Sequence, residues 1–156
     1  ANSAMNGQVL RYVLVKSQET VKKLQPYFHF AAALPKELGQ PKEGEQPTAF
    51  IILCTEGPET PWTGIDIGIA VRTMNLNAYI HGVGSCIIGN VEFEKVKEIL
   101  SIPETWIPRL ALALGYPSHK STIVELPEDG SVKYYLDEER QYYVPKRKRK
   151  DISIIR

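Results

Sequence analysis

The chain has 156 residues, a length that suits one domain with a core of its own. Its 19 basic and 18 acidic residues leave a formal net charge of +1, which excludes a general attraction to nucleic acid or to a membrane surface. A hydrophobic content of 43% fits a globular protein. No apolar run is long enough to span a bilayer and no secretory signal opens the chain, so we expect a cytoplasmic protein without nucleic-acid or membrane partners.

Before residue 60, apolar runs separated by polar segments predict two buried strands and one helix. The strands are residues 9–15 and 49–55, whose unbroken apolar runs are typical of strands covered on both faces. Ser17 is a candidate N-cap for a helix over residues 20–28, which has apolar residues at helical spacing. Residues 31–46 combine Gly, Pro and charged residues, and predict a mobile loop with a short turn of helix at 35–38.

The segment from Trp62 to His81 predicts a central helix. Pro58 and Pro61 precede it, where proline is tolerated, and Gly82 follows it as a C-terminal stop. Its apolar residues lie on more than one face, and few of its residues are charged. A helix that is apolar nearly all round is buried on most sides. We therefore expect either an ordinary core helix or one shared with a second subunit.

The rest of the chain alternates between strand and helix patterns. The predicted elements are a short strand or extended turn at 85–88, a helix at 92–100, a strand at 106–115 and an added strand at 122–126. Asp129-Gly130 is a turn across which residues 131–136 are expected to pair. This order indicates an α/β or α+β sandwich. We predict a single domain over 1–156, with 140–156 as an extended basic arm.

Common motifs for metal, phosphate or nucleophilic chemistry are absent from the sequence. Cys54 and Cys86 both lie in apolar runs, a pattern typical of buried thiols in a reducing compartment. The three histidines are far apart, without metal-ligand spacing. There is no P-loop, and the glycines at Gly82 and Gly84 lack the third glycine of a dinucleotide-binding turn. No Ser-His-Asp arrangement can be argued from spacing.

Two features suggest a binding function. In the opening loop, Ser3, Asn6 and Gln8 offer hydroxyl and amide groups next to a predicted strand. Near the end of the chain, residues 146–150 are five consecutive cations, which repel one another unless an anion lies nearby. A phosphate, a nucleic acid or a receptor for a nuclear-localisation signal would each supply that anion, and a solvated end is the plain alternative.

The motifs and their order resemble the nitroreductase family of FMN-dependent oxidoreductases. The family has a loop of the form Ala-Pro-Ser-x-x-Asn-x-Gln before its first strand, and residues 1–8 here read Ala-Asn-Ser-Ala-Met-Asn-Gly-Gln. Its central helix contains Asp-x-Gly-x-Ala and is followed by Gly-x-Gly-Ser, which match residues 66–70 and 82–85. An Ile-Gly turn, a strand ending in Gly-Tyr-Pro and basic residues after a proline match 88–89, 115–117 and 145–148.

The resemblance implies an α+β fold with a mainly antiparallel central sheet flanked by helices, in an intertwined homodimer with FMN at the subunit interface. It implies NAD(P)H as electron donor, an electron-poor acceptor such as a nitro compound or quinone, and no dedicated catalytic side chain. The implied cofactor-binding residues lie in the opening loop, after the central helix and in the basic tail. They are Asn2, Ser3, Asn6, Gln8, Cys86, Ile88, Gly89, Lys146 and Lys148.

The sequence departs from the family pattern at two places. Family members begin with a helix containing Arg-Arg-Ser-x-Arg, which binds the FMN phosphate, and this sequence starts after that point. Val9 and Leu10 stand where the family has Pro-Trp. Two alternatives therefore stay open: a flavin-binding protein without nitroreductase turnover, and an interaction protein that uses its basic tail. The near-neutral net charge is evidence against the second alternative.

Overall fold

The computed structural model describes residues 3–156, apart from the side chain of Lys36. The chain divides into two compact units. The sheet unit comprises the chain up to Phe30 together with Pro41–Tyr116, and the C-terminal unit comprises Ala31–Gln40 and Pro117–Arg156.

The sheet unit is built on four antiparallel strands. They are β1 (Leu10–Val15), β2 (Ala49–Glu56), β3 (Gly84–Ile88) and β4 (Trp106–Gly115), in the order β1-β2-β4-β3. β2 pairs with β1 and β4, and β3 pairs with β4 at the other edge. The predicted antiparallel central sheet is therefore confirmed, and 85–88 is a strand.

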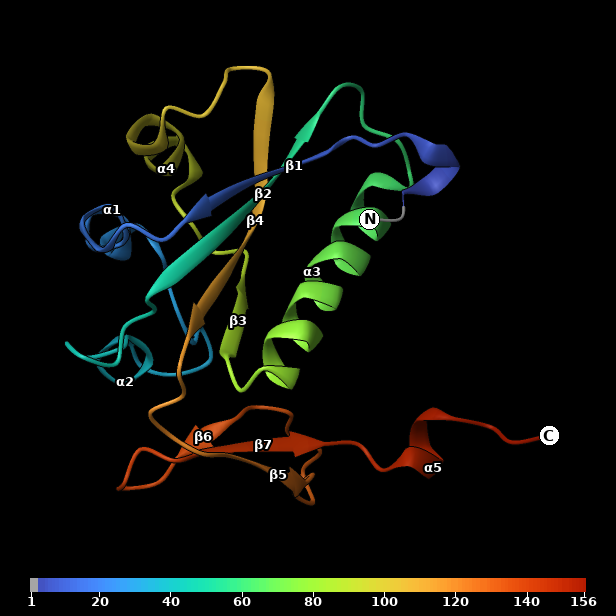
Figure 1. Ribbon diagram of the computed structural model, residues 1–156. Helices are drawn as coiled ribbons and strands as arrows, with labels where there is room; N and C mark the ends of the chain where they lie inside the picture. Colours follow the sequence, from blue (N-terminus) through green and yellow to red (C-terminus); the bar gives the residue numbers. More distant parts are fainter. Residues whose placement is uncertain (1–2) are drawn as a thin grey trace. The chain divides into compact units, whose positions relative to one another are not determined.

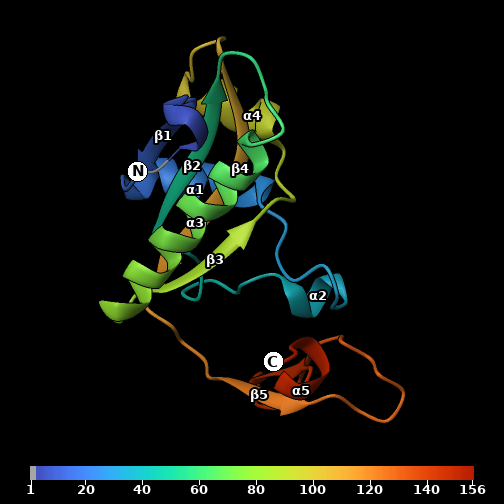
Figure 2. The ribbon, with the colours of Figure 1, turned by 90° about the vertical axis from the view of Figure 1, so that its right-hand side faces the viewer.

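Helices cover both faces of this sheet (Figures 1 and 2). Helices α1 (Gln18–Leu24) and α4 (Phe93–Leu100) lie on one face, and α3 (Thr63–Ile80) lies on the other. Because side chains alternate along a strand, Phe50 and Ile52 of β2 pack with α1 and α4, while Leu53 packs with α3. The unbroken apolar run of β2 thus contributes side chains to two hydrophobic clusters, one on each face of the sheet.

The first helix is shorter than predicted. Ser17 Oγ accepts a hydrogen bond from the Thr20 backbone N–H, which confirms the expected N-cap. The helix ends at Leu24 and continues as a 3₁₀ turn, η2 (Gln25–Tyr27), because Pro26 has no N–H to extend the α-helical pattern. Leu24 and Phe28 are nevertheless buried, as their spacing predicted.

The central helix α3 ends where expected but is less buried than predicted. Gly82 has φ +72°, so it terminates the helix in the left-handed conformation that favours glycine. One face is buried, at Thr63, Asp66, Ile67, Ala70 and Val71. Apolar residues on the remaining surface, including Ile65, Ile69, Leu76, Tyr79 and Ile80, are exposed. The prediction of burial on most sides is wrong for the single chain, because α3 has the sheet on one side only.

The C-terminal unit contains a three-stranded sheet and two short helices. Its elements are α2 (Lys36–Gly39), β5 (Ser121–Glu125), β6 (Tyr135–Leu136), β7 (Tyr142–Lys146) and α5 (Arg149–Ile152). β7 is the middle strand, parallel to β5 and antiparallel to β6. Tyr135 stacks on Tyr143, with ring centroids 5.2 Å apart. Tyr142, the residue before Tyr143 on β7, has its ring centroid 4.6 Å from that of His119.

The expected pairing across Asp129-Gly130 is wrong. Gly130 does form a turn, with φ +70°, but the strand after it pairs with β7 and not with β5. The turn that joins β6 to β7 is instead closed by Asp137, whose Oδ1 accepts hydrogen bonds from the backbone N–H groups of Glu139 and Gln141. This Asp turn, which the sequence reasoning missed, fixes the hairpin at the opposite end of the segment.

Candidate functional site

The opening loop, residues 3–8, folds back on itself around Ser3. The Ser3 hydroxyl oxygen accepts a hydrogen bond from the Gln8 backbone N–H at 2.8 Å. Within the loop, the 3₁₀ turn η1 (Ala4–Asn6) brings the Asn6 N–H to 3.1 Å from the Ser3 carbonyl oxygen. The Gln8 side-chain amide also donates to Asn6 Oδ1, at 2.9 Å. The three polar residues singled out from the sequence therefore form one connected group.

This loop has an unusual backbone. Met5, Asn6 and Gln8 have φ values of 52°, 56° and 51°, in the left-handed region that residues other than glycine rarely adopt. Met5 is also 93% exposed, so packing of its side chain does not explain its conformation. Such conformations persist where surrounding contacts enforce them, and they are frequent at binding sites.

The two ends of the loop are fixed to the sheet unit by charged groups. Both carboxylate oxygens of Asp66, in the first turn of α3, accept the Ala4 backbone N–H at 3.0 Å. At the other end, Arg11 Nη1 donates to the Gln8 carbonyl oxygen at 2.8 Å. Arg11 is itself held by Glu56, with Nε and Nη2 each 2.8 Å from Oε2.

Glu56 also contacts the loop that precedes β4. Its Oε1 accepts a hydrogen bond from Thr105 at 2.9 Å. That hydrogen bond, together with the positive charge of Arg11, keeps the pKa of Glu56 below its ordinary value. The carboxylate is thus held in the charged form that Arg11 requires.

Several polar groups of the loop remain available to a ligand. Within the described chain, the side-chain N–H groups of Asn6 and the side-chain carboxamide oxygen of Gln8 make no hydrogen bond to other residues. The Ser3 hydroxyl accepts one hydrogen bond and retains its own proton for donation. Two kinds of donor and one acceptor therefore lie together on an exposed, conformationally fixed loop.

The second group of predicted residues lies at the β3 edge of the sheet. Ile88 is buried among the residues that pack with α1 and α4, so it offers almost no surface to a ligand in the single chain. Cys86 is exposed, whereas Cys54 on the central strand β2 is buried. The expectation that both thiols are buried is therefore wrong for Cys86, because β3 is an edge strand with one neighbour. Gly89 follows directly after β3.

Contacts between β3 and the central helix hold this edge in place. The Asn75 side-chain amide of α3 donates to Ser85 Oγ at 2.7 Å. Asn75 in turn accepts a hydrogen bond from Arg72, one turn earlier on the helix. The start of β3 is thereby fixed beside α3, which also supports the opening loop through Asp66.

The two predicted phosphate-binding lysines belong to the C-terminal unit. Lys146 ends β7, opposite Glu125 of β5 in the strand register. Lys148 follows it and forms an ion pair with Glu125, at 2.9 Å, which raises the pKa of the lysine. Lys146 is thus the last residue of β7, and Lys148 lies in the segment directly after the strand.

The structure thus brings together some of the predicted residues and not others. Ser3, Asn6 and Gln8 are in mutual contact, and the β3-edge positions lie in the same unit without a hydrogen bond to them. Asn2 lies outside the described residues. Sequence reasoning missed the roles of Asp66 and Arg11 as anchors of the loop. Asp66 belongs to the predicted helix motif, but its partner Ala4 is 62 residues away in the sequence. Sequence pattern alone does not predict a contact over that separation.

The sheet unit has an apolar hollow beside the central helix. It has a volume of about 520 Å³ and lies between α3 and strands β1 and β2. Its lining residues are Tyr12, Leu14, Ile51, Ile69, Ala70, Thr73 and Met74. Leu14 is 62% exposed, so this part of the sheet face is left uncovered by α3 in the single chain.

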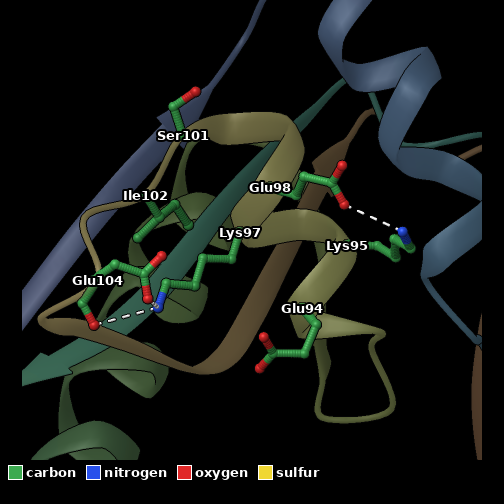
Figure 3. A pocket seen from close by; sticks show the side chains of 7 residues that line it. All are labelled: Glu94, Lys95, Lys97, Glu98, Ser101, Ile102 and Glu104. Atoms are coloured by element: carbon green, nitrogen blue, oxygen red, sulfur yellow. Dashed lines mark hydrogen bonds and ion pairs between the residues drawn. The ribbon is translucent and has the colours of Figure 1, made fainter.

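A second hollow, of about 450 Å³, lies along α4 and the loop that follows it (Figure 3). Its lining is mostly charged, and the charges pair with one another: Lys95 with Glu98 at 3.2 Å, and Lys97 with Glu104 at 2.9 Å. None of the predicted cofactor-binding residues lines it. We assign it no role in the candidate site.

The described residues offer neither a metal site nor a membrane-spanning helix. Within residues 3–156, no cluster of three or more His, Cys, Asp or Glu residues is arranged to hold a metal ion. In the same part of the chain, every helix is too short or too polar to cross a membrane.

Comparison with known proteins gives a consistent result. Residues 1–116 match the family model described as "Nitroreductase family". A Bacillus subtilis protein named FMN reductase (NADPH) is 31% identical over 111 residues, which are 70% of this chain and 44% of that protein. An Archaeoglobus fulgidus protein named putative NADH dehydrogenase/NAD(P)H nitroreductase is 28% identical over 134 residues, covering 80% of this chain and 71% of that protein.

Solved structures show the same fold. NfrA1 of B. megaterium has a TM-score of 0.61 and 24% identity, over 88% of this chain and 60% of that chain. The hypothetical oxidoreductase YcnD of Bacillus subtilis has a TM-score of 0.60 and 23% identity, over 89% of this chain and 62% of that chain. The chain spans less than half the length of the FMN reductase and about three fifths of these two structures.

Proposed function

This chain belongs to the nitroreductase family, and from that premise we propose that it is an FMN-dependent oxidoreductase. It passes electrons from NAD(P)H through the bound flavin to an electron-poor acceptor such as a nitro compound or a quinone. The observation on which this proposal rests is the opening loop, a fixed and exposed group of donors and acceptors at the position of the family's flavin-contacting motif. Support also comes from the names of two relatives, an FMN reductase and a putative NAD(P)H nitroreductase.

The residues present fit FMN chemically. A flavin has a polar edge of carbonyl and N–H groups and a hydroxylated ribityl chain, which need donors and acceptors in fixed positions. Asn6 supplies donors, Gln8 an acceptor and Ser3 a hydroxyl, on a backbone held in place at both ends. In this proposal the backbone around Cys86, Ile88 and Gly89, of which Cys86 and Gly89 are exposed and Ile88 is buried, faces the ring.

The phosphate of FMN is assigned to Lys146 and Lys148. Lysine ammonium groups form charge-assisted hydrogen bonds with phosphate oxygens. Lys148 already binds an anionic oxygen, that of Glu125, which shows that its side chain can be held in one position by a carboxylate. In this proposal the negative charge of Glu125 competes with the phosphate for Lys148.

No side chain of this chain is assigned as a catalytic acid, base or nucleophile. FMN, when bound, supplies the redox chemistry, accepting electrons from NAD(P)H and passing them on. The chain's own residues bind the flavin, orient it and hold its polar edge. This division of labour requires a rigid site, and the anchored opening loop meets that requirement.

We further propose that two copies form a homodimer through the exposed face of α3. Ile65, Ile69 and Leu76 are each about half exposed, at 51%, 47% and 46%, and Tyr79 and Ile80 are more so. Together with the apolar hollow beside β1, they form a contiguous region whose exposure is unfavourable in a monomer. A second copy covering it would complete the burial expected from the composition of the helix.

A cytoplasmic location is part of the same proposal. Both cysteines are free thiols, a state typical of a reducing compartment.

The proposal is tested by titrating the purified protein with FMN and following the quenching of flavin fluorescence. Saturable quenching, followed by steady-state oxidation of NADH or NADPH with a quinone or nitroaromatic acceptor, is the expected result. Saturable quenching without turnover would reduce the function to flavin binding. A protein that leaves flavin fluorescence unchanged would contradict the proposal.

A further inference from the structure

We infer that Asp66 is a positioning residue for the flavin, acting through the opening loop without touching the cofactor. Its carboxylate holds the Ala4 backbone N–H and thereby fixes the conformation in which Asn6 and Gln8 present their free groups. The inference rests on the proposed function, because it assigns a role in the binding of the proposed cofactor.

The burial of Asp66 shows that this anchor is specific. Asp66 is only 5% exposed, and among the described residues it is the only charged side chain in the buried class. Burying a carboxylate is unfavourable unless hydrogen bonds or a favourable field compensate. Here both oxygens accept the Ala4 N–H at 3.0 Å, and the first turn of α3 adds the positive end of the helix dipole.

The opening loop needs such an anchor. Three of its residues, Met5, Asn6 and Gln8, are held in the left-handed region, which is unfavourable for residues with a Cβ atom. The hydrogen bonds that the loop residues make with one another, such as that between Ser3 and Gln8, do not attach the loop to the rest of the sheet unit. The bond to Asp66 ties the start of the loop to a helix that is packed on the sheet (Figure 1).

Asp66 is the stronger of the two anchors. Arg11 and Glu56, which hold the other end, have side chains that are 36% and 33% exposed, so solvent screens their ion pair. The carboxylate of Asp66 is shielded from solvent and its hydrogen bond is charge-assisted. A loop already ordered in its binding conformation loses less entropy when the ligand binds.

The test compares Asp66→Asn with the matched control Thr63→Val. Asn keeps the shape of Asp66 but loses the charge. Thr63 lies in the same turn of α3, is 3% exposed, and its Oγ1 accepts the Thr60 backbone N–H at 3.0 Å, without a hydrogen bond to residues 3–8. Both variants weaken the start of α3, and only Asp66→Asn removes the charged anchor of the opening loop.

Two readouts separate positioning from general stability. Hydrogen exchange without FMN reports on the amides of Asn6, Gly7 and Gln8, which are bonded within the opening loop. FMN titration reports on affinity, both alone and in an Asn6→Ala background. We expect Asp66→Asn to speed exchange at these amides and to weaken FMN binding about tenfold, because a neutral hydrogen bond replaces the charge-assisted one. In the Asn6→Ala background the loss falls to about twofold or less, because both changes act through one loop.

Thr63→Val is expected to leave both the loop exchange and the FMN affinity at wild-type values. The inference is overturned if Asp66→Asn leaves loop exchange or FMN affinity unchanged, if Thr63→Val weakens FMN equally, or if the effects of Asp66→Asn and Asn6→Ala are additive. Absence of FMN binding by the wild-type protein would contradict the proposed function itself. In that case unchanged loop exchange in Asp66→Asn would separately show that Asp66 does not order the loop.

Discussion

The sheet unit and the C-terminal unit of this chain are stabilised in different ways. In the described residues, the large apolar side chains that are buried all belong to the sheet unit, in two clusters on opposite faces of the sheet. The C-terminal unit is instead held by short strands, the ring contacts of Tyr142 and Tyr143, and the hydrogen bonds of Asp137. The loop proposed to contact the flavin is therefore anchored to a well-packed scaffold, whereas the lysines proposed to bind phosphate stand on one with little apolar core.

The largest expected effect comes from the sheet-unit core. Phe50 is fully buried and stacks on Phe28, with ring centroids 4.2 Å apart. Phe50→Ala is expected to lower the free energy of unfolding by about 3–5 kcal/mol, measured by urea unfolding with tryptophan fluorescence. Both tryptophans, Trp62 and Trp106, lie in the sheet unit and report on it.

The control for this prediction is Ile123→Ala in β5, whose side chain is 74% exposed. It should change the unfolding midpoint of the sheet unit very little, since surface substitutions are within about 0.5 kcal/mol. Equal losses in the two variants would contradict the difference between the units.

The second prediction concerns the exposed face of α3. Ile69 is 47% exposed and lines the apolar hollow beside β1. Ile69→Glu would place an unpaired charge in the proposed dimer interface, and should weaken dimerisation by about 3 kcal/mol, roughly a hundredfold in the dissociation constant. Analytical ultracentrifugation over a concentration series measures this. A matched change of Ile123→Glu in the C-terminal unit should leave the association unchanged, and dimerisation of Ile69→Glu at the wild-type concentration would contradict the proposed interface.

A third prediction tests the role of the C-terminal unit in FMN binding. The double variant Lys146→Ala/Lys148→Ala removes the two proposed phosphate ligands and should weaken FMN binding about tenfold or more. The control Arg149→Ala/Lys150→Ala removes the same number of charges from α5 and should have a much smaller effect. Equal losses would show that the tail acts only through its total charge.

Glu125→Gln tests the same lysine and is expected to change FMN affinity in the opposite direction. It removes the carboxylate that pairs with Lys148 and so frees the lysine for phosphate. Because exposed ion pairs are weak, FMN affinity should rise by only about twofold. A fall in affinity would show that Glu125 helps to position Lys148 and does not compete with the cofactor.

The smallest effect is a pH dependence of the C-terminal unit that arises from Tyr143. The hydrogen bond from Tyr143 to Asp137, at 3.1 Å, and the charge of that carboxylate raise the pKa of Tyr143 above its ordinary value of 10.0. The folded unit therefore keeps this proton at a pH where the unfolded chain has lost it, and its stability falls as the pH rises above that value. The difference in tyrosinate absorbance between wild type and Tyr143→Phe should show one group that titrates at a pH above 10.0. A group that titrates at the ordinary value would contradict this.

The same contrast explains what could be predicted from the sequence. Strands β2 and β4 and the end of α3 at Gly82 were predicted because local apolar runs and a positive-φ glycine determine them. The hairpin in the C-terminal unit was predicted wrongly, since Asp137 competed with Asp129-Gly130 as the turn and no buried face fixed the strand pairing.

The candidate site was predictable in part for the same reason. The polar residues of the opening loop are close in sequence, and their pattern predicted a binding loop. The contact between Ala4 and Asp66 depends on tertiary structure, as does the exposure of Cys86 on an edge strand. Neither can be derived from local pattern.

The most direct test of the account is sedimentation velocity of the protein with FMN, recorded at both protein and flavin absorbance. We expect the flavin to sediment together with a species of twice the mass of the 17.6 kDa chain. Flavin that sediments with a single chain, or that remains free while the protein sediments alone, would contradict a cofactor bound between two copies.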